Sequence, residues 1–128
     1  MSEFLPDLFK NFSIGVDIEN ISRFENKAHE GIFLTKIFTP SELEYCFSKS
    51  SPARHLAARF CAKEAIIKAL SSLDGIKPYY KEIEILNTQD GNPYVNLINY
   101  NEKFNVKISL SHCEDKAIAF ATAYYISV

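Results

Sequence analysis

The sequence predicts one α+β domain, in which an antiparallel sheet packs against a long central helix and several shorter helices. Residues 52–70 form an uninterrupted helical stretch whose surface is apolar on nearly all sides, as expected of a helix inside a core. Helical patterns come early in the chain, and strand patterns joined by short turns dominate its second half. A chain of 128 residues, 47% of them hydrophobic, has the size of a single domain spanning 1–128.

The first clear pattern is a strand. Residues 12–18 alternate, with four apolar side chains on one face and Ser13, Gly15 and Asp17 on the other. An acid beside glycine and serine does not fill a core, so Asp17 is either a solvated residue or a ligand in a cleft. Residues 1–11 form an N-terminal extension, whose apolar residues at helical spacing predict either a short amphipathic turn packed on the core or a partner-binding helix.

Two capping-box patterns predict short helices ahead of the central one. Residues 22–25 would open the first helix, which Gly31 would end. Residues 39–42 would open the second, with a proline at its first helical position, and this helix would run to about Phe47. Ser51-Pro52 has the same form and predicts the start of the central helix.

The second half of the chain predicts four strands. Glu82–Leu86 and Tyr94–Ile98 flank a turn at residues 90–93 and form a hairpin. A third strand carries alternating apolar residues at 106–110, and a turn at 112–115 leads into a last strand, 117–128. This strand is apolar on both faces and carries a stripe of alternate alanines suited to close packing, so we expect it at the centre of a sheet or at an interface.

Four charged residues interrupt the apolar surface of the central helix: Arg59, Lys63, Glu64 and Lys68. Glu64 and Lys68 are four residues apart, in the order that favours an ion pair along a helix. Arg59 and Lys63 have the same spacing but like charges, which costs about 0.2–0.5 kcal/mol in an isolated helix. The two cations therefore indicate either an anion site or side chains that reach water from opposite edges of the helix.

Composition argues against several classes of protein. A net charge of −2 is not that of a general nucleic-acid binder, and no apolar run reaches membrane-spanning length. The first residues lack the basic region of a secretory signal, and three cysteines without Cys-x-x-Cys spacing are typical of reduced thiols. We therefore expect a cytoplasmic protein with no nucleic-acid or membrane partner.

Asp17 and Glu64 are the acids placed to carry chemistry, with His112 after a predicted strand. Two carboxylates with few other polar groups suit Mg²⁺, which completes its coordination with phosphate and water. Zinc is not expected, because the histidines and cysteines show no ligand spacing. The residues alone thus indicate a metal–phosphate ligand.

Five sequence blocks, in order, resemble the holo-[acyl-carrier-protein] synthases, the short 4′-phosphopantetheinyl transferases. The most specific is a Lys-Glu-Ala helix with a second lysine four residues after the glutamate. The blocks are Gly15-Val-Asp-Ile18 with Ile21-Ser-Arg-Phe-Glu25, Phe38-Thr-Pro-Ser-Glu-Leu43, the helix from Arg59 to Leu70, Gly91-Asn-Pro-Tyr94 and Ser109-Leu-Ser-His112. The matches extend from Gly15 to about Phe120.

The resemblance implies the 4′-phosphopantetheinyl transferase fold and a reaction. In this reaction the phosphopantetheine arm of coenzyme A passes to a serine of apo acyl carrier protein, releasing adenosine 3′,5′-bisphosphate, in fatty acid biosynthesis. Asp17 and Glu64 match the acids that hold Mg²⁺ against the pyrophosphate, and Glu64 is also the candidate base for the serine. Lys68 would neutralise phosphate oxygens one helical turn away.

The resemblance also assigns binding roles. The phosphates of coenzyme A would supply the anion for Arg59 and Lys63. Pro93 and His112 align with positions near the nucleotide, although a hairpin turn and a capped turn would explain them equally well. Arg23 matches the position that docks the acidic carrier protein. A homotrimer with active sites between subunits is implied too.

Two features depart from the family pattern. The loop at residues 71–78 has one glycine and an added acid where the family commonly has a glycine-rich loop facing phosphates, and the N-terminal extension is longer than usual. Two alternatives therefore stay open. One is a module that keeps the fold without the chemistry, and the other is an enzyme that uses a different pyrophosphate donor.

Overall fold

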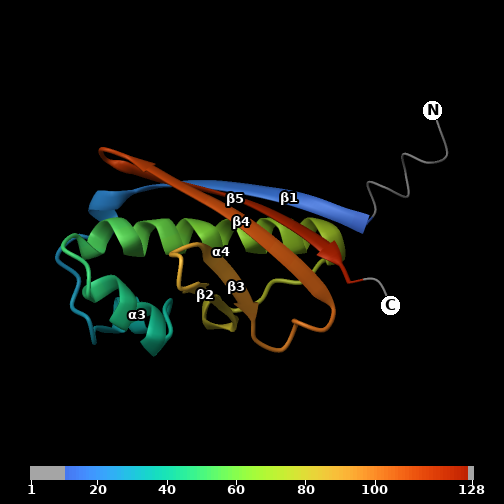
Figure 1. Ribbon diagram of the computed structural model, residues 1–128, viewed down its shortest axis with the longest axis horizontal. Coiled ribbons are helices and arrows are strands. Elements are labelled where there is room, and N and C mark those ends of the chain that lie inside the picture. The colour runs from blue at the N-terminus through green and yellow to red at the C-terminus, as the bar shows by residue number, and fades with distance from the viewer. Residues whose placement is uncertain (1–10, 127–128) are drawn as a thin grey trace.

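The computed structural model describes residues 11–126, so the helical turn expected in the N-terminal extension lies outside the described residues. The longest element, α4 (Pro52–Asp74), runs through the middle of the molecule. A three-stranded sheet covers one side of α4, whereas α3 (Pro40–Phe47) and a hairpin of β2 (Ile83–Asn87) and β3 (Pro93–Leu97) lie on the other (Figure 1). This arrangement confirms the predicted α+β class.

The three-stranded sheet has the order β1–β5–β4, with both strand pairs antiparallel. Its strands are β1 (Phe12–Asn20), β4 (Phe104–Cys113) and β5 (Lys116–Tyr125). As its two apolar faces predicted, β5 is central. Its alternate alanines, Ala117, Ala119, Ala121 and Ala123, are fully buried. They let the sheet approach α4 within the chain, so the small-residue stripe is not a surface left for a partner.

Strand β1 packs on α4 through its polar face. Gly15 is buried there, and a Cβ atom on it would lie 2.0 Å from the Ala65 carbonyl oxygen. The Ser13 hydroxyl donates to the carbonyl oxygen of Ala69 in the same helix. The apolar face of β1 therefore points outward, and Ile14, Val16 and Ile18 are 52–59% exposed.

The helix predictions had mixed outcomes. In α3 the predicted capping box is present, because the Thr39 side chain accepts from Glu42 N and the Glu42 side chain accepts from Thr39 N. The predicted first helix is wrong: residues 21–24 form a short 3-10 helix, η1, whose N-cap Asn20 makes no side-chain cap. Gly31 does not end it, but precedes a separate short helix, α2 (Ile32–Thr35).

The central helix extends one turn beyond its predicted end. It runs to Asp74, where Gly75 adopts a φ of 76° and closes it as a left-handed C-cap. The last turn before β5 is also shorter than predicted, because β4 continues through His112 to Cys113. No helix within residues 11–126 is long and apolar enough to cross a membrane.

Candidate active site

Asp17 and Lys68 meet where β1 packs on α4, one helical turn from Glu64. The Lys68 ammonium lies 3.2 Å from Asp17 Oδ1 and donates to the Val16 carbonyl oxygen at 2.9 Å. Lys68 thus pairs with Asp17 on β1. It does not form the ion pair with Glu64 that their spacing in the helix suggested. The contact fixes Asp17 beside the helix that carries Glu64.

Both carboxylates act on one buried thiol. Burial first, and then the charge of Asp17, raises the pKa of Cys61 to about 12, with Glu64 contributing in the same direction. Cys61 therefore stays protonated, and its Sγ donates to the Ala117 carbonyl oxygen at 3.4 Å. The charge of Glu19 acts in the same direction, so Cys61 lies in a region of negative potential produced by the acids of β1 and α4.

Tyr80 is a site residue that sequence reasoning missed. Its hydroxyl donates to Glu64 Oε1 at 2.8 Å, from the short 3-10 helix η2 (Tyr80–Glu82) that precedes β2. Burial and the hydrogen bond to Glu64 raise the pKa of Tyr80 to about 12, so the hydroxyl remains a donor at neutral pH. No local pattern marks this role, because Tyr80 follows Glu64 by 16 residues and meets it only in the folded chain.

The acidic pair suits a hard cation. Asp17 on β1 pairs with Lys68, which lies one helical turn from Glu64 on α4, and Mg²⁺ prefers oxygen ligands with phosphate and water completing its shell. Among residues 11–126 no cluster of three or more His, Cys, Asp or Glu could hold a metal by itself. The residues therefore fit an ion that takes only two protein ligands, Asp17 and Glu64, beside a phosphate-bearing substrate.

A cleft of about 520 Å³ opens between α3, α4, β4 and the β2–β3 turn. Three residues predicted to lie near a nucleotide line it: Arg59, Pro93 and His112. His112 is part of strand β4, and Pro93 begins β3. The fold thus brings together residues that are up to 53 positions apart in the sequence.

Arg59 is the most buried cation of this cleft, at 3% exposure. Its guanidinium lies 4.1 Å from the centre of the Tyr45 ring and donates to Asn87 Oδ1 at 2.5 Å. Its Nε is buried with no hydrogen-bond partner among the described residues. Among the described residues no carboxylate forms an ion pair with this buried guanidinium, so its charge at the wall of a cleft favours an anionic ligand.

The electrostatics of the cleft point the same way. Burial lowers the pKa of His55, which also lines the cleft, and the nearby charge of Arg59 lowers it further. Lys49, His112 and Arg54 contribute in the same direction. His55 and His112 therefore line this cleft together with Arg59, and sequence reasoning did not single out His55.

Lys63 does not belong to this cleft. Its ammonium is fully buried, 2.8 Å from Glu42 Oε1, and donates to the carbonyl oxygens of Tyr80 and Ile83 at 2.8 and 2.7 Å. Its three N–H donors are thus all used inside the fold. This geometry contradicts the expectation that Lys63 binds an anion with Arg59. A spacing of four residues on a helix does not reveal which of the two side chains meets α3 and β2.

Arg23 lies on η1 at the edge of the acidic centre. Its guanidinium pairs with Glu19 at 2.6 Å and lies 4.9 Å from the centre of the Phe60 ring. Its side chain is 47% exposed. Its positive charge acts to lower the pKa of Tyr80, against the effects of burial and of Glu64. Arg23 is therefore both accessible to a partner and close to the proposed metal ligands.

Comparisons with known proteins give a consistent family. Residues 13–121 match the 4′-phosphopantetheinyl transferase superfamily. A holo-[acyl-carrier-protein] synthase of Thermodesulfovibrio yellowstonii is 44% identical over 110 residues, which cover 84% of this chain and 93% of the relative. The corresponding protein of Chlamydia muridarum is 44% identical over 117 residues, which cover 88% of this chain and 94% of the relative.

Solved structures give the same match. The Helicobacter pylori holo-[acyl-carrier-protein] synthase in complex with coenzyme A superposes with a TM-score of 0.70 at 30% identity, covering 88% of this chain and 99% of that one. The ACPS–CoA complex of Chronobacterium ammoniagenes gives a TM-score of 0.73 at 28% identity, covering 91% and 98%.

Proposed function

The chain belongs to the 4′-phosphopantetheinyl transferase superfamily, within the holo-[acyl-carrier-protein] synthases, and from this we propose that it moves 4′-phosphopantetheine from coenzyme A to a serine of apo acyl carrier protein. One observation carries the proposal: α4 carries Glu64 beside the strand that bears Asp17 and, five residues earlier, the buried cation Arg59 at a basic cleft. A molecule with a nucleotide phosphate and a pyrophosphate needs both features.

The basic cleft would bind the nucleotide end of coenzyme A. Arg59 would place its positive charge beside a phosphate, and His112 would donate at the rim of the cleft. Pro93 would shape the wall beside the nucleotide. Adenosine 3′,5′-bisphosphate, the product released from this end, carries the same charges and would compete for the same contacts.

Asp17 and Glu64 would hold Mg²⁺ beside the pyrophosphate. When bound, the ion supplies charge neutralisation and orientation for phosphoryl transfer. Glu64 would also take the proton from the carrier serine as the serine oxygen bonds to the phosphorus of the arm and the bond from that phosphorus to the bisphosphate breaks. Lys68, whose side chain is 55% exposed, would neutralise phosphate oxygens.

The carrier protein would dock beside this centre, through Arg23. An accessible cation at the edge of the acidic pair suits an acidic partner that must present a serine there. Its ion pair with Glu19 competes for the same charge, so long-range attraction should be modest. The reaction would serve fatty acid biosynthesis in the cytoplasm.

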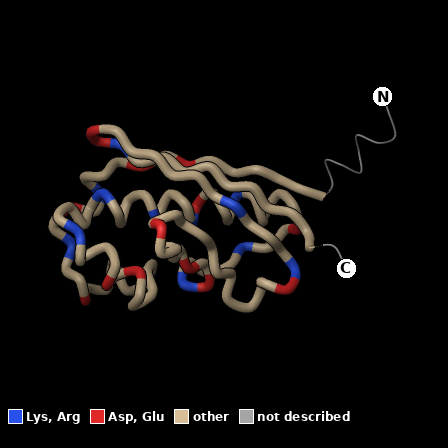
Figure 2. Tube along the Cα trace, viewed as in Figure 1, with Lys and Arg blue, Asp and Glu red and all other residues tan. Residues whose placement is uncertain are grey.

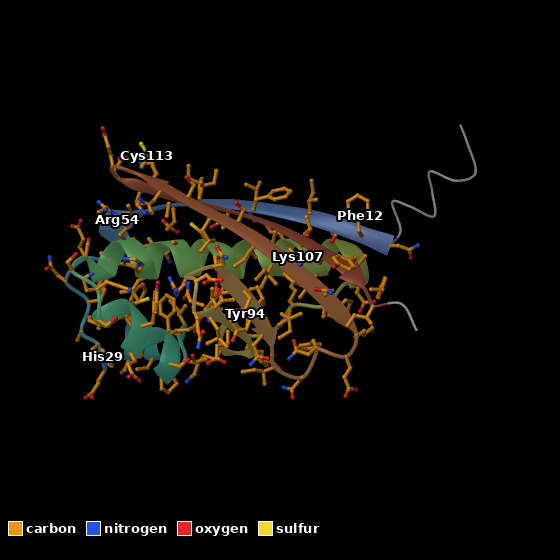
Figure 3. The ribbon with its side chains drawn as sticks, in the orientation of Figure 1. Phe12, His29, Arg54, Tyr94, Lys107 and Cys113 are labelled. Carbon is orange, nitrogen blue, oxygen red and sulfur yellow. The ribbon has the colours of Figure 1, made fainter. Side chains whose placement is uncertain are left out.

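We also propose a homotrimer with its active sites between subunits. The outer face of β1 and β5 is apolar and exposed, with Val16 opposite Phe120 and Ile18 opposite Ile118 in the register. Phe12 also lies on the side of the sheet away from α4 (Figure 3). Charged residues are sparse along the middle of these strands (Figure 2). A continuous apolar face of this kind favours contact with further copies of the chain.

Two measurements test these proposals. Purified protein, apo carrier protein, coenzyme A and Mg²⁺ should increase the mass of the carrier by one phosphopantetheine group. No gain with any divalent ion would leave a non-catalytic binding module as the better account. Light scattering at micromolar concentration should give the mass of three chains, and a monomer would contradict the trimer.

A further inference from the structure

Tyr80 contacts two adjacent residues of α4 that point in different directions. Its hydroxyl donates to Glu64 Oε1 at 2.8 Å, and its backbone carbonyl oxygen accepts from Lys63 Nζ at 2.8 Å. Lys63 points into the core, whereas Glu64 is only partly buried. One residue of η2 therefore links the buried ion pair of the fold to the acid proposed to bind metal.

We propose that Tyr80 is a positioning residue for this reaction, which holds the Glu64 carboxylate in the orientation that metal binding and proton transfer require. This inference rests on the proposed function, because it assumes that Glu64 is a metal ligand and base. Tyr80 acts through Glu64 and needs no contact with substrate.

The backbone of Tyr80 is fixed from the core side. Lys63, which holds the Tyr80 carbonyl, is fully buried and bonded to Glu42 at 2.8 Å. The Tyr80 ring also packs on Phe60, with the ring centres 5.6 Å apart. Because the Tyr80 backbone and ring are both held, the Tyr80 hydroxyl has little freedom. It can therefore restrain the flexible, partly exposed side chain of Glu64.

The hydrogen bond also distinguishes the two oxygens of Glu64. Tyr80 engages Oε1, so Oε2 is the oxygen left to face a cation or a serine hydroxyl. A carboxylate held by a second residue is pre-oriented, and loss of such a partner typically costs about 10–100-fold in metal affinity or activity. Without the hydroxyl, the Glu64 side chain would sample other rotamers.

The test compares two single-atom changes at neighbouring positions. Tyr80→Phe removes the hydroxyl and keeps the ring and the carbonyl bonded to Lys63. Tyr79→Phe makes the same change at a residue that is 82% exposed, and serves as the matched control. Mn²⁺ is the probe, and its binding in the presence of coenzyme A is measured by electron paramagnetic resonance of the free ion.

We expect Tyr80→Phe to weaken Mn²⁺ binding by about 10–100-fold and Tyr79→Phe to leave it unchanged. In the transfer assay, Tyr80→Phe should raise the half-saturating Mg²⁺ concentration and lower kcat. Unchanged Mn²⁺ affinity in Tyr80→Phe would overturn the inference, including the case in which only the melting temperature falls. A wild-type protein that binds Mn²⁺ but does not modify the carrier contradicts the proposed function alone.

A double-mutant cycle on kcat/KM separates positioning from an independent effect. If Tyr80 acts through Glu64, Tyr80→Phe should cost little more once Glu64→Gln is present. An equal fold-loss in both backgrounds would mean that Tyr80 acts elsewhere, and would overturn the inference. Because each variant is compared with its own background, a general loss of stability does not imitate the expected coupling.

Discussion

Replacing Gly15 with alanine should damage both the fold and the active site. The added Cβ would lie 2.0 Å from the Ala65 carbonyl oxygen, about 1.4 Å inside an ordinary contact of 3.4 Å, and 3.0 Å from Ala69 N. Both neighbours are backbone atoms of α4, so a rotamer change cannot relieve the contact. Strand β1 must therefore move away from the helix, together with Asp17 two residues further along.

The expected cost is about 1–3 kcal/mol of unfolding free energy, as for other overpacked sites. For a chain of this size, that lowers the melting temperature by roughly 4 °C per kcal/mol. Because an error of about 1 Å in a reacting group can cost about 10²-fold in rate, transfer measured well below the melting temperature should fall by about that factor. The two assays are thermal unfolding by circular dichroism and the mass of the modified carrier.

Gly31→Ala is the matched control. It makes the same chemical change at a φ of −71°, where the nearest atoms to the new Cβ are 3.2–3.3 Å away and belong to Ala28. We expect a smaller loss of stability and an unchanged transfer rate. A Gly15→Ala protein that melts and turns over like the wild type would refute the argument that this glycine seats β1 on α4.

Other predictions address single residues. Excess Mg²⁺ should partly rescue Asp17→Asn and rescue Glu64→Gln poorly. The rate of Glu64→Gln should fall about 10²–10⁴-fold further, because it loses a base as well as a ligand; equal rescue would restrict Glu64 to metal binding. Arg23→Ala should raise the KM for the carrier and weaken its salt dependence; an equal rise in the KM for coenzyme A would contradict a docking role. Lys63→Met leaves the buried carboxylate of Glu42 without a counter-charge. The free energy of unfolding, measured in urea, should fall by about 3–5 kcal/mol; a loss below about 1 kcal/mol would show that the ion pair is dispensable. Burial raises the pKa of Cys46 from 9.0 to about 12, so this thiol stabilises the fold below pH 9 and that contribution is lost as pH rises toward 12. Cys46→Ala should therefore flatten the decline in urea midpoint above pH 9, and an unchanged slope would assign that decline to other groups.

The sequence by itself determined the elements whose signals are local. The capping box at Thr39 and Glu42 formed as predicted, because it needs only residues three positions apart. The central helix and the alternating strands also followed from periodicity. The family blocks gave Asp17 and Glu64 as candidate ligands, and the charges of both raise the pKa of the Cys61 thiol.

Only the tertiary structure decided which partner each side chain meets. Alternation separates the two faces of β1 but does not say which face is covered, and here the glycine face packs on α4 while Ile14 and Val16 stay exposed. Their spacing allowed Lys68 to pair with Glu64, but in the fold Lys68 pairs with Asp17 on β1. Lys63 and Tyr80 show the same limit: their contacts join residues 16 to 21 positions apart, and such contacts are set by how elements pack together and not by any local pattern.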